Sequence, residues 1–552
     1  MSTGSTPEPY TGASVAVIGN GPVGQTTALL LARWGIPVTL LDARPARDMI
    51  GSKAICQQRD VLDVWEAVGA GAKVAAEGVT WTQARTFYRE HELFCVEFQD
   101  RGRSAFPPWV NISQSRTEQI LDERIAASPL IECWWDHNVV GIDQDDEGIT
   151  ITCHGSRGAT AFRAPYVVAC GGARSDPLRA MLGLTFPGHT FEDYFLICDI
   201  RADLGEWRHE RRFYFDPEWN PGRQVLIHPC PDSTYRIDWQ VPPEFDITHE
   251  IESGGLDRRI RQIVGDTDYE IVWNSVYRFH SRHADRLRVG RVLIAGDCGH
   301  LVSPFGARGL NSGVQDAENA AWKIAFVLRG WASEDLLESY HDERLAAAKE
   351  NIDVTTGTMD FLVPRDERAW HRRRNILQRA VADPAARAAV DSGRLAETFW
   401  YAHSPLTTPH PWRESPGRPP RGETPPVVPG VLVPDVPIAV ASEPAVRRSR
   451  DIIRDGLLAL TADGVDVGQV EAILASSTSA PARVHAIAEI DIEGLLAGAV
   501  EPQPGDVWLV RPDGHVAAVI ECADGEALRA AVWRALANPV MSSAGSAYVV
   551  RT

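Results

Sequence analysis

The stretch "ASVAVIGNGPVGQTTALLLARWGIPVTLLDARP", residues 13–45, decides the fold. A short apolar run leads into Gly19–Gly24, an apolar helix-like run follows and ends at Gly35, and a second apolar run ends at Asp42. This order predicts a strand, a tight glycine turn, a helix and a second strand. A G-x-G-x-x-G turn between strand and helix, with an acid about 20 residues further on, is the fingerprint of a dinucleotide-binding β-α-β unit.

Each glycine of this turn has an expected task. Gly19 permits the tight turn, Gly21 lets a pyrophosphate approach the backbone, and Gly24 lets the helix pack close to the strand. Asp42 is placed to accept hydrogen bonds from an adenosine ribose and disfavours a 2′-phosphate there, so we expect FAD or NAD and not NADP. The cofactor contacts predicted from this unit are Gly19, Gly21, Pro22, Gly24, Asp42, Ala43 and Arg44.

A second glycine-rich stretch, "AGDCGHLVSPFGARGLNSGVQDAENAAWKIAFVL", spans Ala295–Leu328. It predicts a strand end, a Gly/Pro loop and an Ala-rich helix. Such a unit presents free backbone N–H groups and the positive end of a helix to whatever lies in the loop. Asp297 ends the strand, where a carboxylate can accept hydrogen bonds from sugar-like hydroxyls. Alone, the stretch predicts only an anion or polyol site, and the N-terminal unit makes it more specific.

Composition limits the other classes. A chain of 552 residues should hold two or three domains. The net charge of −19 argues against nucleic acid or an anionic membrane as the main partner. No apolar run approaches the roughly 20 residues of a membrane span, and Met1–Ala13 lacks a signal-peptide core. The nine cysteines form no C-x-x-C pair, so we expect no metal site and a cytoplasmic protein with reduced thiols.

The chain order predicts an α/β protein with three domains. Strand and helix patterns suggest a discontinuous Rossmann-like domain, an inserted mixed-β domain for the substrate, a Pro-rich linker and a small C-terminal α/β domain. We expect the Rossmann-like domain at residues 1–183 and 286–400, and the inserted domain at 184–285. The linker is expected at 404–434 and the C-terminal domain at 435–552. An acidic turn within residues 131–155 also predicts a β-hairpin.

Three segments together carry a family resemblance: the glycine turn with Asp42, "CGGARSDPLR" (Cys170–Arg179) and "GDCGHLVSPFGARGLNSG" (Gly296–Gly313). In this order they resemble the class A flavoprotein monooxygenases, the FAD-dependent aromatic hydroxylases. The nearest branch includes phenol, 3-(3-hydroxyphenyl)propionate and polyketide hydroxylases. That branch has a C-terminal thioredoxin-like domain, which "LVRPDGHVAAV" (Leu509–Val519) resembles. Without C-x-x-C, this domain would serve structure or assembly, and the resemblance suggests a homodimer.

The resemblance implies further FAD contacts. Arg59 and Gln114 match residues near the ribityl and pyrophosphate groups, and Val139 matches a position near the adenine. Asp297 matches the acid on the ribityl side. The loop positions near the isoalloxazine are Pro304, Gly306, Ala307, Arg308, Leu310 and Asn311. Arg308 either adds a positive charge beside the reduced, anionic flavin or points to solvent.

The implied reaction begins when NAD(P)H reduces FAD. Oxygen then adds at flavin C4a, and the resulting hydroperoxide hydroxylates a phenolic or other electron-rich ring. A base or relay near the phenol hydroxyl helps, and the catalytic candidates are Tyr214, His228 and Tyr235, with Arg236 less favoured. Strand alternation does not say which of these faces the substrate, and ordinary packing explains each of them more simply. Trp219, Trp239 and Phe305 are candidates for apolar walls.

One position departs from the family pattern. Gly171 stands where the second segment usually has an acid linked to FAD and pyridine nucleotide handling. Arg174, Ser175 and Arg179 remain, and no second G-x-G-x-x-G unit follows, so NAD(P)H would dock transiently. Two other functions therefore stay open. One is Baeyer–Villiger or other oxygenation of a polycyclic or quinonoid substrate, and the other is a flavin-binding sensor or assembly protein that does not oxygenate.

Overall fold

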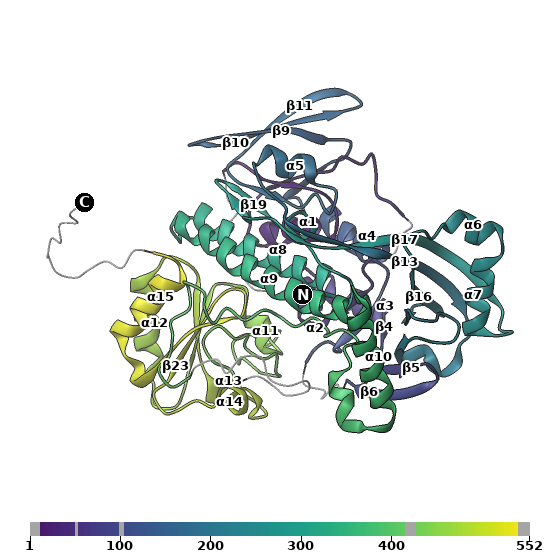
Figure 1. The fold of residues 1–552 in the computed structure, drawn as a ribbon. Coiled ribbons are helices and arrows are strands. Elements are labelled where there is room, and N and C mark those ends of the chain that lie inside the picture. The colour runs from purple at the N-terminus through teal and green to yellow at the C-terminus, as the bar shows by residue number, and fades with distance from the viewer. Residues whose placement is uncertain (1–11, 50–52, 99–103, 414–425, 539–552) are drawn as a thin grey trace. The chain divides into compact units, whose positions relative to one another are not determined.

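A computed structural model describes residues 12–49, 53–98, 104–413 and 426–538 (Figure 1). These residues divide into two compact units. The larger unit comprises the described residues of Thr6–Ala321 and Arg344–Thr398, and the smaller comprises those of Trp322–Glu343 and Phe399–Thr552. No helix among the described residues has the length and apolar character needed to cross a bilayer.

The predicted β-α-β unit forms the middle of a six-stranded sheet. Its order is β18-β19-β12-β1-β2-β8, parallel throughout except for the antiparallel edge strand β18. The strands are β18 (Arg288–Val289), β19 (Val292–Ile294), β12 (Val167–Ala169), β1 (Val15–Ile18), β2 (Val38–Leu41) and β8 (Ile131–Trp134). The four middle strands are buried along their whole length, as expected for a parallel sheet covered on both faces. This confirms the Rossmann-like domain.

The helices of this domain follow its strands. The glycine turn opens α1 (Pro22–Arg33), and α4 (Gln114–Ala126) packs against it. The loop after β19 leads through β20 (His300–Leu301) into α8 (Arg308–Leu328), which is followed by α9 (Glu338–Leu362) and α10 (Glu367–Ala382). The shorter helices are α2 (Arg59–Glu66), α3 (Gly71–Glu77) and α5 (Asp176–Met181).

An eight-stranded mixed sheet forms the second part of the larger unit. Its order is β20-β17-β13-β16-β15-β14-β5-β6, antiparallel except for the parallel pair β14–β5. The strands not yet named are β17 (Tyr269–His283), β13 (Gly188–Ala202), β16 (Thr234–Val241), β15 (Gln224–Cys230), β14 (Glu210–Phe215), β5 (Gln83–Tyr88) and β6 (His91–Glu97).

The sheet corrects the predicted range 184–285 for the substrate domain. β5 and β6 come from the range assigned to the FAD domain, as does β20 at the opposite edge. Strand patterns identify β5 and β6 as strands, but they do not reveal a parallel pairing such as Phe213↔Thr86, which joins residues far apart in the chain.

The two faces of the eight-stranded sheet pack against different elements. On one face, Ile237 and Trp239 pack with Leu256 and Ile260 of α7 (Gly255–Val264), and α6 (Ile247–Glu252) lies on the same side (Figure 1). The opposite face contributes its aromatic residues to a cluster with the loop before α8, α9 and α10. Members of this cluster, here called the aromatic cluster, include Phe195, Phe213, Phe215, Leu226, Phe279, Phe305, Met359, Leu377 and Ala380.

Two small sheets complete the larger unit. β9 (Asn138–Asp145), β10 (Gly148–Gly155) and β11 (Gly158–Ala164) form an antiparallel meander. The acidic turn between β9 and β10 confirms the predicted hairpin, whereas β8, expected in the same hairpin, joins the six-stranded sheet instead. The other sheet has the order β3 (Cys56–Gln58), β7 (Trp109–Asn111) and β4 (Val79–Thr80).

The smaller unit contains a four-stranded sheet of order β22-β21-β23-β24. β21 (Leu457–Thr461), α12 (Val467–Ser477) and β22 (Ala482–Ala486) form a parallel β-α-β unit. The antiparallel pair β23 (Val507–Val510) and β24 (Val516–Ile520) and the helix α15 (Gly525–Ala535) follow it. This is the thioredoxin-like arrangement expected from the sequence. The remaining helices are α11 (Ser449–Ile452), α13 (Ile487–Ile490) and α14 (Leu495–Val500).

The predicted linker, residues 404–434, is packed into the smaller unit where the structure describes it. Val431 and Val433 are buried, and the N–H groups of Thr408 and Gly430 donate to carbonyls of β24 at 2.8 and 2.7 Å. Proline blocks helices and central strands, but it does not prevent an extended chain from burying its valines. Residues 414–425 of the predicted linker lie outside the described part of the chain.

Candidate functional site

The glycine turn at the start of α1 has one crowded side and one open side. A Cβ atom on Gly19, where φ is +103°, would lie 2.3 Å from the Cys170 carbonyl oxygen, and one on Gly24 would lie 1.8 Å from the Gly19 oxygen. A Cβ on Gly21 would meet no atom within 4 Å. Pro22 begins the helix directly after this open position. The turn therefore leaves space at the residue where the sequence predicts a pyrophosphate.

Asp42 follows β2 and holds this turn in place. Its carboxylate accepts hydrogen bonds from the Asn20 backbone N–H at 2.7 Å and from the Arg44 backbone N–H at 2.8 Å. The Arg44 guanidinium donates to both carboxylate oxygens, at 3.0 and 3.1 Å. Burial alone would raise the pKa of Asp42, but the bonds from Arg44 and Asn20 outweigh it and hold the pKa below its usual value. Asp42 is thus an ionised acceptor beside the turn, and Ala43 next to it is exposed.

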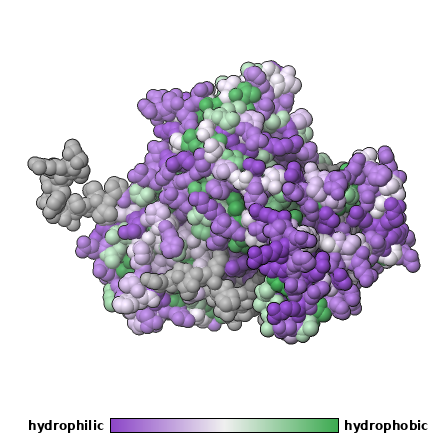
Figure 2. Space-filling view, viewed as in Figure 1, coloured by the Kyte–Doolittle hydropathy of each residue, from purple (hydrophilic) through white to green (hydrophobic). Residues whose placement is uncertain are grey.

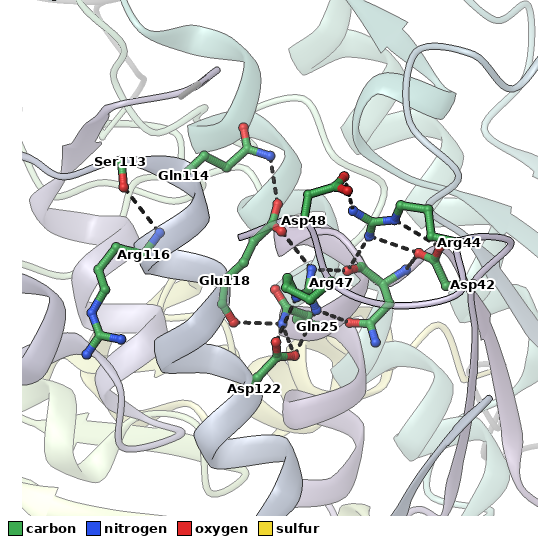
Figure 3. A network of polar contacts seen from close by, with 11 residues as sticks. Gln25, Asp42, Arg44, Arg47, Asp48, Ser113, Gln114, Arg116, Glu118 and Asp122 are labelled. Carbon is green, nitrogen blue, oxygen red and sulfur yellow. Dashed lines mark hydrogen bonds and ion pairs between the residues drawn. The ribbon is translucent and has the colours of Figure 1, made fainter. Parts of the chain in front are cut away.

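Arg47, which the sequence analysis missed, joins the turn to α4 (Figure 3). Its guanidinium pairs with Glu118 at 2.6 Å and Asp122 at 2.7 Å, and it donates to the Asn20 backbone oxygen at 2.6 Å. Gln25 of α1 donates to Asp122 at 2.7 Å. In the sequence, Arg47 is visible only as the second arginine of "DARPAR". Its acidic partners Glu118 and Asp122 lie about 70 positions further along the chain, and no local pattern reveals them.

Of the three contacts inferred by resemblance, Gln114 bonds to this network, whereas Arg59 and Val139 make other contacts. Gln114, the first residue of α4, donates to Glu118 at 2.8 Å. Arg59 begins α2 and donates to the Ser104 hydroxyl at 2.9 Å. Val139 lies half-buried in β9, whose sheet shares no strand with the six-stranded sheet. Their contacts with FAD stay predictions.

The two sequence motifs meet at Val23 of α1. A Cβ atom on Gly296 would lie 3.0 Å from the Val23 side chain, and one on Gly313 would lie 2.6 Å from it. The turn after β19 and the first part of α8 therefore pack directly on the helix that follows the glycine turn. Close packing of this kind explains why both stretches need glycine.

Asp297 lies in that turn and is available to a ligand. Its side chain is exposed, although Gly296 and Cys298 on either side are buried. It has no hydrogen-bond or ion-pair partner among the described residues. Partial desolvation by the surrounding protein raises the pKa of Asp297. An unpaired acid at the end of a parallel strand fits a ligand with hydroxyl donors, such as the ribityl chain of FAD.

A buried set of residues, here called the Asp316 network, fixes the Asp297 turn. Asp316 of α8 accepts hydrogen bonds from the Gly296 backbone N–H at 2.8 Å, from His300 Nε2 at 2.7 Å and from Arg344 Nε at 2.6 Å. Arg344 also donates to the Ser312 carbonyl and hydroxyl, both at 3.1 Å. Burial raises the pKa of Asp316, but Arg344 and His300 outweigh it and hold the pKa far below its usual value.

The loop before α8 gives Arg308 a role different from the predicted one. The guanidinium is 2% exposed and donates to the carbonyl oxygens of Arg394 at 3.2 Å and Leu395 at 3.1 Å, and to Asn351 at 2.7 Å. It is neither a solvent arginine nor a free charge beside the loop. Gly306, with φ at +100°, packs against the same segment, since its Cβ would lie 2.1 Å from the Arg394 oxygen.

Asn311 is also engaged through its side chain. Its amide accepts from the Gln58 backbone N–H at 3.0 Å and donates to the carbonyls of Cys56 at 3.0 Å and Ala307 at 2.6 Å. Pro304 is exposed and Leu310 is half-buried. In this loop the backbone, and not the Arg308 or Asn311 side chain, is therefore available to a ligand.

Two of the three catalytic candidates lie on the face of the eight-stranded sheet that is opposite to Phe305. Tyr235 packs in the cluster under α7, and Trp239 does the same. Tyr214 stacks on Phe87 at 4.7 Å, and its hydroxyl accepts from Arg212 at 3.0 Å. Strand alternation puts both tyrosines opposite to the face that meets Phe305. The structure thus does not bring them to the loop before α8, and Trp219, 5.6 Å from Tyr214, lies with them.

His228 lies on the other face, in a polar group next to the aromatic cluster. It is 7% exposed, and its Nδ1 lies 3.8 Å from the Cys56 thiol. Burial, Arg211 and Arg236 hold the pKa of His228 well below its usual value, so the imidazole is neutral. Arg236 donates to Asp238 at 3.1 Å. Because these side chains alternate with Tyr235 and Ile237, His228 and Arg236 are the candidates on the sheet face that meets Phe305.

Local packing explains why glycine, and not an acid, stands at position 171. A Cβ atom there would lie 2.6 Å from the hydroxyl of Ser175, which donates to the Gly172 carbonyl at 2.7 Å. An acid at this position would have to displace Ser175. Arg179 is buried and donates to the Cys298 carbonyl at 2.9 Å. The segment therefore supports the Asp297 turn.

Comparison with known proteins agrees with this geometry. The model of the FAD binding domain family matches residues 12–355. Among similar proteins is a 3-(3-hydroxy-phenyl)propionate/3-hydroxycinnamic acid hydroxylase of Comamonas testosteroni, 29% identical over 66% of this chain and 61% of its own length. The corresponding protein of Klebsiella pneumoniae (strain 342) is 29% identical over 64% of this chain and 63% of its own length. The matched region thus spans less than two thirds of these relatives.

Solved structures share the fold over nearly the whole chain. The flavin-dependent monooxygenase PieE, in complex with FAD and substrate, has a TM-score of 0.80 at 23% identity and covers 96% of this chain and 100% of its own. Aklavinone-11 hydroxylase with FAD and aklavinone has a TM-score of 0.75 at 24% identity, covering 95% and 99%. The family match, which extends over both glycine-rich motifs and the Asp297 turn, shows that this chain belongs to the FAD binding domain family, with FAD as its cofactor.

Proposed function

We propose that this protein is an FAD-dependent monooxygenase that uses NAD(P)H and O2 to hydroxylate a phenolic or other aromatic substrate. The observation that supports it best is the meeting of the loop before α8 with an aromatic sheet face. Phe305 of that loop lies 5.4 Å from Phe195, 6.1 Å from Phe213 and 6.2 Å from Phe279, measured between ring centroids. The hydroxylase names of the Comamonas and Klebsiella relatives support the same reaction class.

Bound FAD would accept a hydride from NAD(P)H and activate O2. The contribution of this chain is to place the flavin and keep its reduced, anionic form stable. The first turn of α8 offers unpaired backbone N–H groups and roughly half a positive charge at the helix N-terminus. Arg308 and Asn311 bind protein atoms instead, so we assign the stabilisation to the helix backbone.

His228 is our candidate for binding the phenol hydroxyl. A neutral imidazole can accept a hydrogen bond from the phenol hydroxyl, and nearby Arg211 and Arg236, which oppose a charge on the imidazole, favour ionisation of the phenol because opposite charges stabilise the phenolate. A phenolate attacks an electrophilic oxygen more readily than a phenol does. His228→Gln should therefore lower the hydroxylation rate by about 10²-fold or more, with FAD affinity unchanged.

The test is a stopped-flow and product assay on the FAD-loaded protein. Flavin reduction by NADH and NADPH is followed with and without a panel of phenols that includes 3-(3-hydroxyphenyl)propionate, and products are analysed after reaction under ¹⁸O2. We expect phenol-stimulated reduction and one labelled ring hydroxyl. A labelled lactone would instead favour Baeyer–Villiger oxygenation. No reduction by either nucleotide would refute the monooxygenase and favour a non-oxygenating flavoprotein.

A further inference from the structure

Helix α10 has an arginine-rich outer side on a strongly acidic protein. The chain has a net charge of −19, yet residues 365–379 contain six arginines and only two acids. One of those acids, Asp366, is occupied as the helix cap, where it accepts from the Ala369 N–H at 2.7 Å. Figure 2 shows strongly hydrophilic residues where α10 lies in Figure 1. The arginines are Arg365, Arg368, Arg372, Arg373, Arg374 and Arg379.

Most of the exposed arginines of residues 365–379 have no ion-pair partner in the described part of the chain. Arg365 pairs with Asp360 at 2.8 Å, and Arg379 lies 3.9 Å from Asp383. Arg368, Arg372 and Arg374 are exposed and have no ion-pair or hydrogen-bond partner in the described part of the chain. Arg368 and Arg372 are one helical turn apart on the same side of α10, and Arg374 lies on the other flank of its exposed side. We call these three residues the arginine face.

A fourth arginine lies beneath this face. Arg373 is 4% exposed and lies over the rings of Phe215 at 5.5 Å and Trp370 at 5.1 Å. Its Nε and Nη2 atoms are buried and have no hydrogen-bond partner among the residues that the structure describes. Burial, only partly offset by Asp216, lowers its pKa to about 10, so it remains charged at neutral pH. A buried cation without full compensation is costly, and a bound anion nearby would offset that cost.

The inner side of α10 connects this charge to the candidate flavin site. Leu377 and Ala380 belong to the same aromatic cluster as Phe305 of the loop before α8. The arginine face is therefore separated from that cluster by the thickness of one helix. An anion on α10 would lie beside the part of the larger unit where the flavin ring is proposed to bind.

We propose that the arginine face of α10 binds the phosphate groups of the pyridine dinucleotide that reduces the flavin. This inference rests on the proposed function. The sequence has no second G-x-G-x-x-G unit for this nucleotide, so its phosphates need another positive surface. Arginine forks match phosphate oxygens in geometry. A local positive field also offsets the repulsion that a protein of net charge −19 exerts on a polyanion, and it speeds encounter.

The test compares two charge reversals of equal size. Arg372→Glu changes the arginine face. Arg157→Glu changes an exposed arginine in the turn between β10 and β11, which has no ion-pair partner in the described chain. The reductive half-reaction of the FAD-loaded proteins is measured with NADH and with NADPH over a range of salt concentrations. Reduction by dithionite, followed by reoxidation in air, serves as the control for an intact flavin site.

We expect Arg372→Glu to raise the apparent Kd of the nucleotide about tenfold at low salt, an effect that should shrink as salt screens the charges. The limiting reduction rate and FAD affinity should stay unchanged, and Arg157→Glu should behave as the wild type. Equal Kd values in the two variants would overturn the proposal. So would a change only in gel-filtration elution of Arg372→Glu, since that would assign the face to a second copy of the chain. Failure of both nucleotides to reduce the wild-type flavin would instead refute the proposed function.

Discussion

Helices α8 and α9 contribute to two buried charge networks, one in each compact unit. In the larger unit, Asp316 of α8 pairs with Arg344 of α9 at 2.6 Å. In the smaller unit, Lys323 of α8 pairs with Glu343 of α9, also at 2.6 Å. All four side chains are fully buried. Adjacent residues of α9 thus belong to two networks whose partners differ.

The network in the smaller unit, here called the Lys323 network, is held together mainly by bonds between side chains. Arg511 binds Glu343 at 2.5 and 3.0 Å and Asp513 at 2.5 Å, and Ser404 donates to Glu343 at 2.5 Å. Burial lowers the pKa of Lys323 to about 8, although Glu343 opposes the shift. This network fastens the thioredoxin-like domain to residues 322–343 within the smaller unit.

The Asp316 network differs because one of its bonds holds the backbone of the Gly296 turn. Asp316 holds Gly296, and the turn at Gly296 presents the unpaired carboxylate of Asp297. Buried charge alone therefore does not identify a ligand site. What matters is the group to which the buried charge is bonded. The Asp316 network holds the Gly296 turn, whereas the Lys323 network holds the smaller unit together.

The largest effect should follow from Asp316→Ala. This change leaves Arg344 and His300 buried without their anion, and breaking such a pair costs about 3–5 kcal/mol. We expect a loss of that size in the free energy of unfolding and loss of measurable FAD binding, because the Gly296 turn is released. Urea unfolding and flavin fluorescence titration measure the two. Asp353→Ala, at an exposed position of α9, should change neither.

Glu343→Gln should destabilise the protein without affecting the cofactor. Lys323 loses its anion, whereas Arg511 keeps Asp513, so we expect a cost of about 3 kcal/mol in urea unfolding. The dissociation constant for FAD should stay within about threefold of the wild type, as for changes outside a site's own contacts. If this variant lost FAD as completely as Asp316→Ala, the two networks would not be functionally separate.

Acidification should weaken both networks. Burial alone would raise the pKa values of Asp316, Glu343 and Asp513, but their basic partners outweigh it and hold all three far below the ordinary 3.8 for Asp and 4.5 for Glu. The unfolded chain therefore binds protons at a higher pH than the folded chain does. The stability that these three carboxylates contribute is fully present above their ordinary pKa values, and it is lost as the pH falls below those values. Urea unfolding at pH 7, 5, 4 and 3 should show this decline, and Glu343→Gln should decline less steeply. An equal slope would assign the loss to other carboxylates.

Much of the fold was predictable because its signals are local. The glycine turn, the strands beside it and Asp42 lie within residues 13–45, and G-x-G-x-x-G demands a specific turn. The hairpin β9–β10 and the α8 loop follow from short patterns of the same kind. The linker prediction failed because proline content reports backbone restriction and says nothing of the burial of Val431 and Val433.

The features that could not be predicted depend on contacts between residues that are distant in sequence. Arg47 joins the turn to α4 only because folding brings Glu118 and Asp122 beside it, and Asp316 reaches Gly296 only once α8 has packed on the sheet. Strand alternation places neighbours such as Tyr235 and Arg236 on opposite faces of a strand, but only the structure, through the positions of α7 and Phe305, shows which face meets the proposed site. Arg308 shows the opposite case. Its place in the loop suggested a cofactor contact, but its guanidinium donates to a protein carbonyl instead.

The smallest effect on stability, and the most direct test of the FAD site, comes from a single methyl group at Gly21. Gly21→Ala meets no protein atom within 4 Å, whereas Gly24→Ala would place its Cβ 1.8 Å from the Gly19 oxygen. We expect Gly24→Ala to unfold at lower urea. Gly21→Ala should keep the wild-type free energy of unfolding within about 0.5 kcal/mol and yet bind FAD at least tenfold more weakly in a fluorescence titration, because the methyl group occupies the space of the pyrophosphate. Wild-type FAD affinity in Gly21→Ala would contradict the placement of the cofactor at this turn.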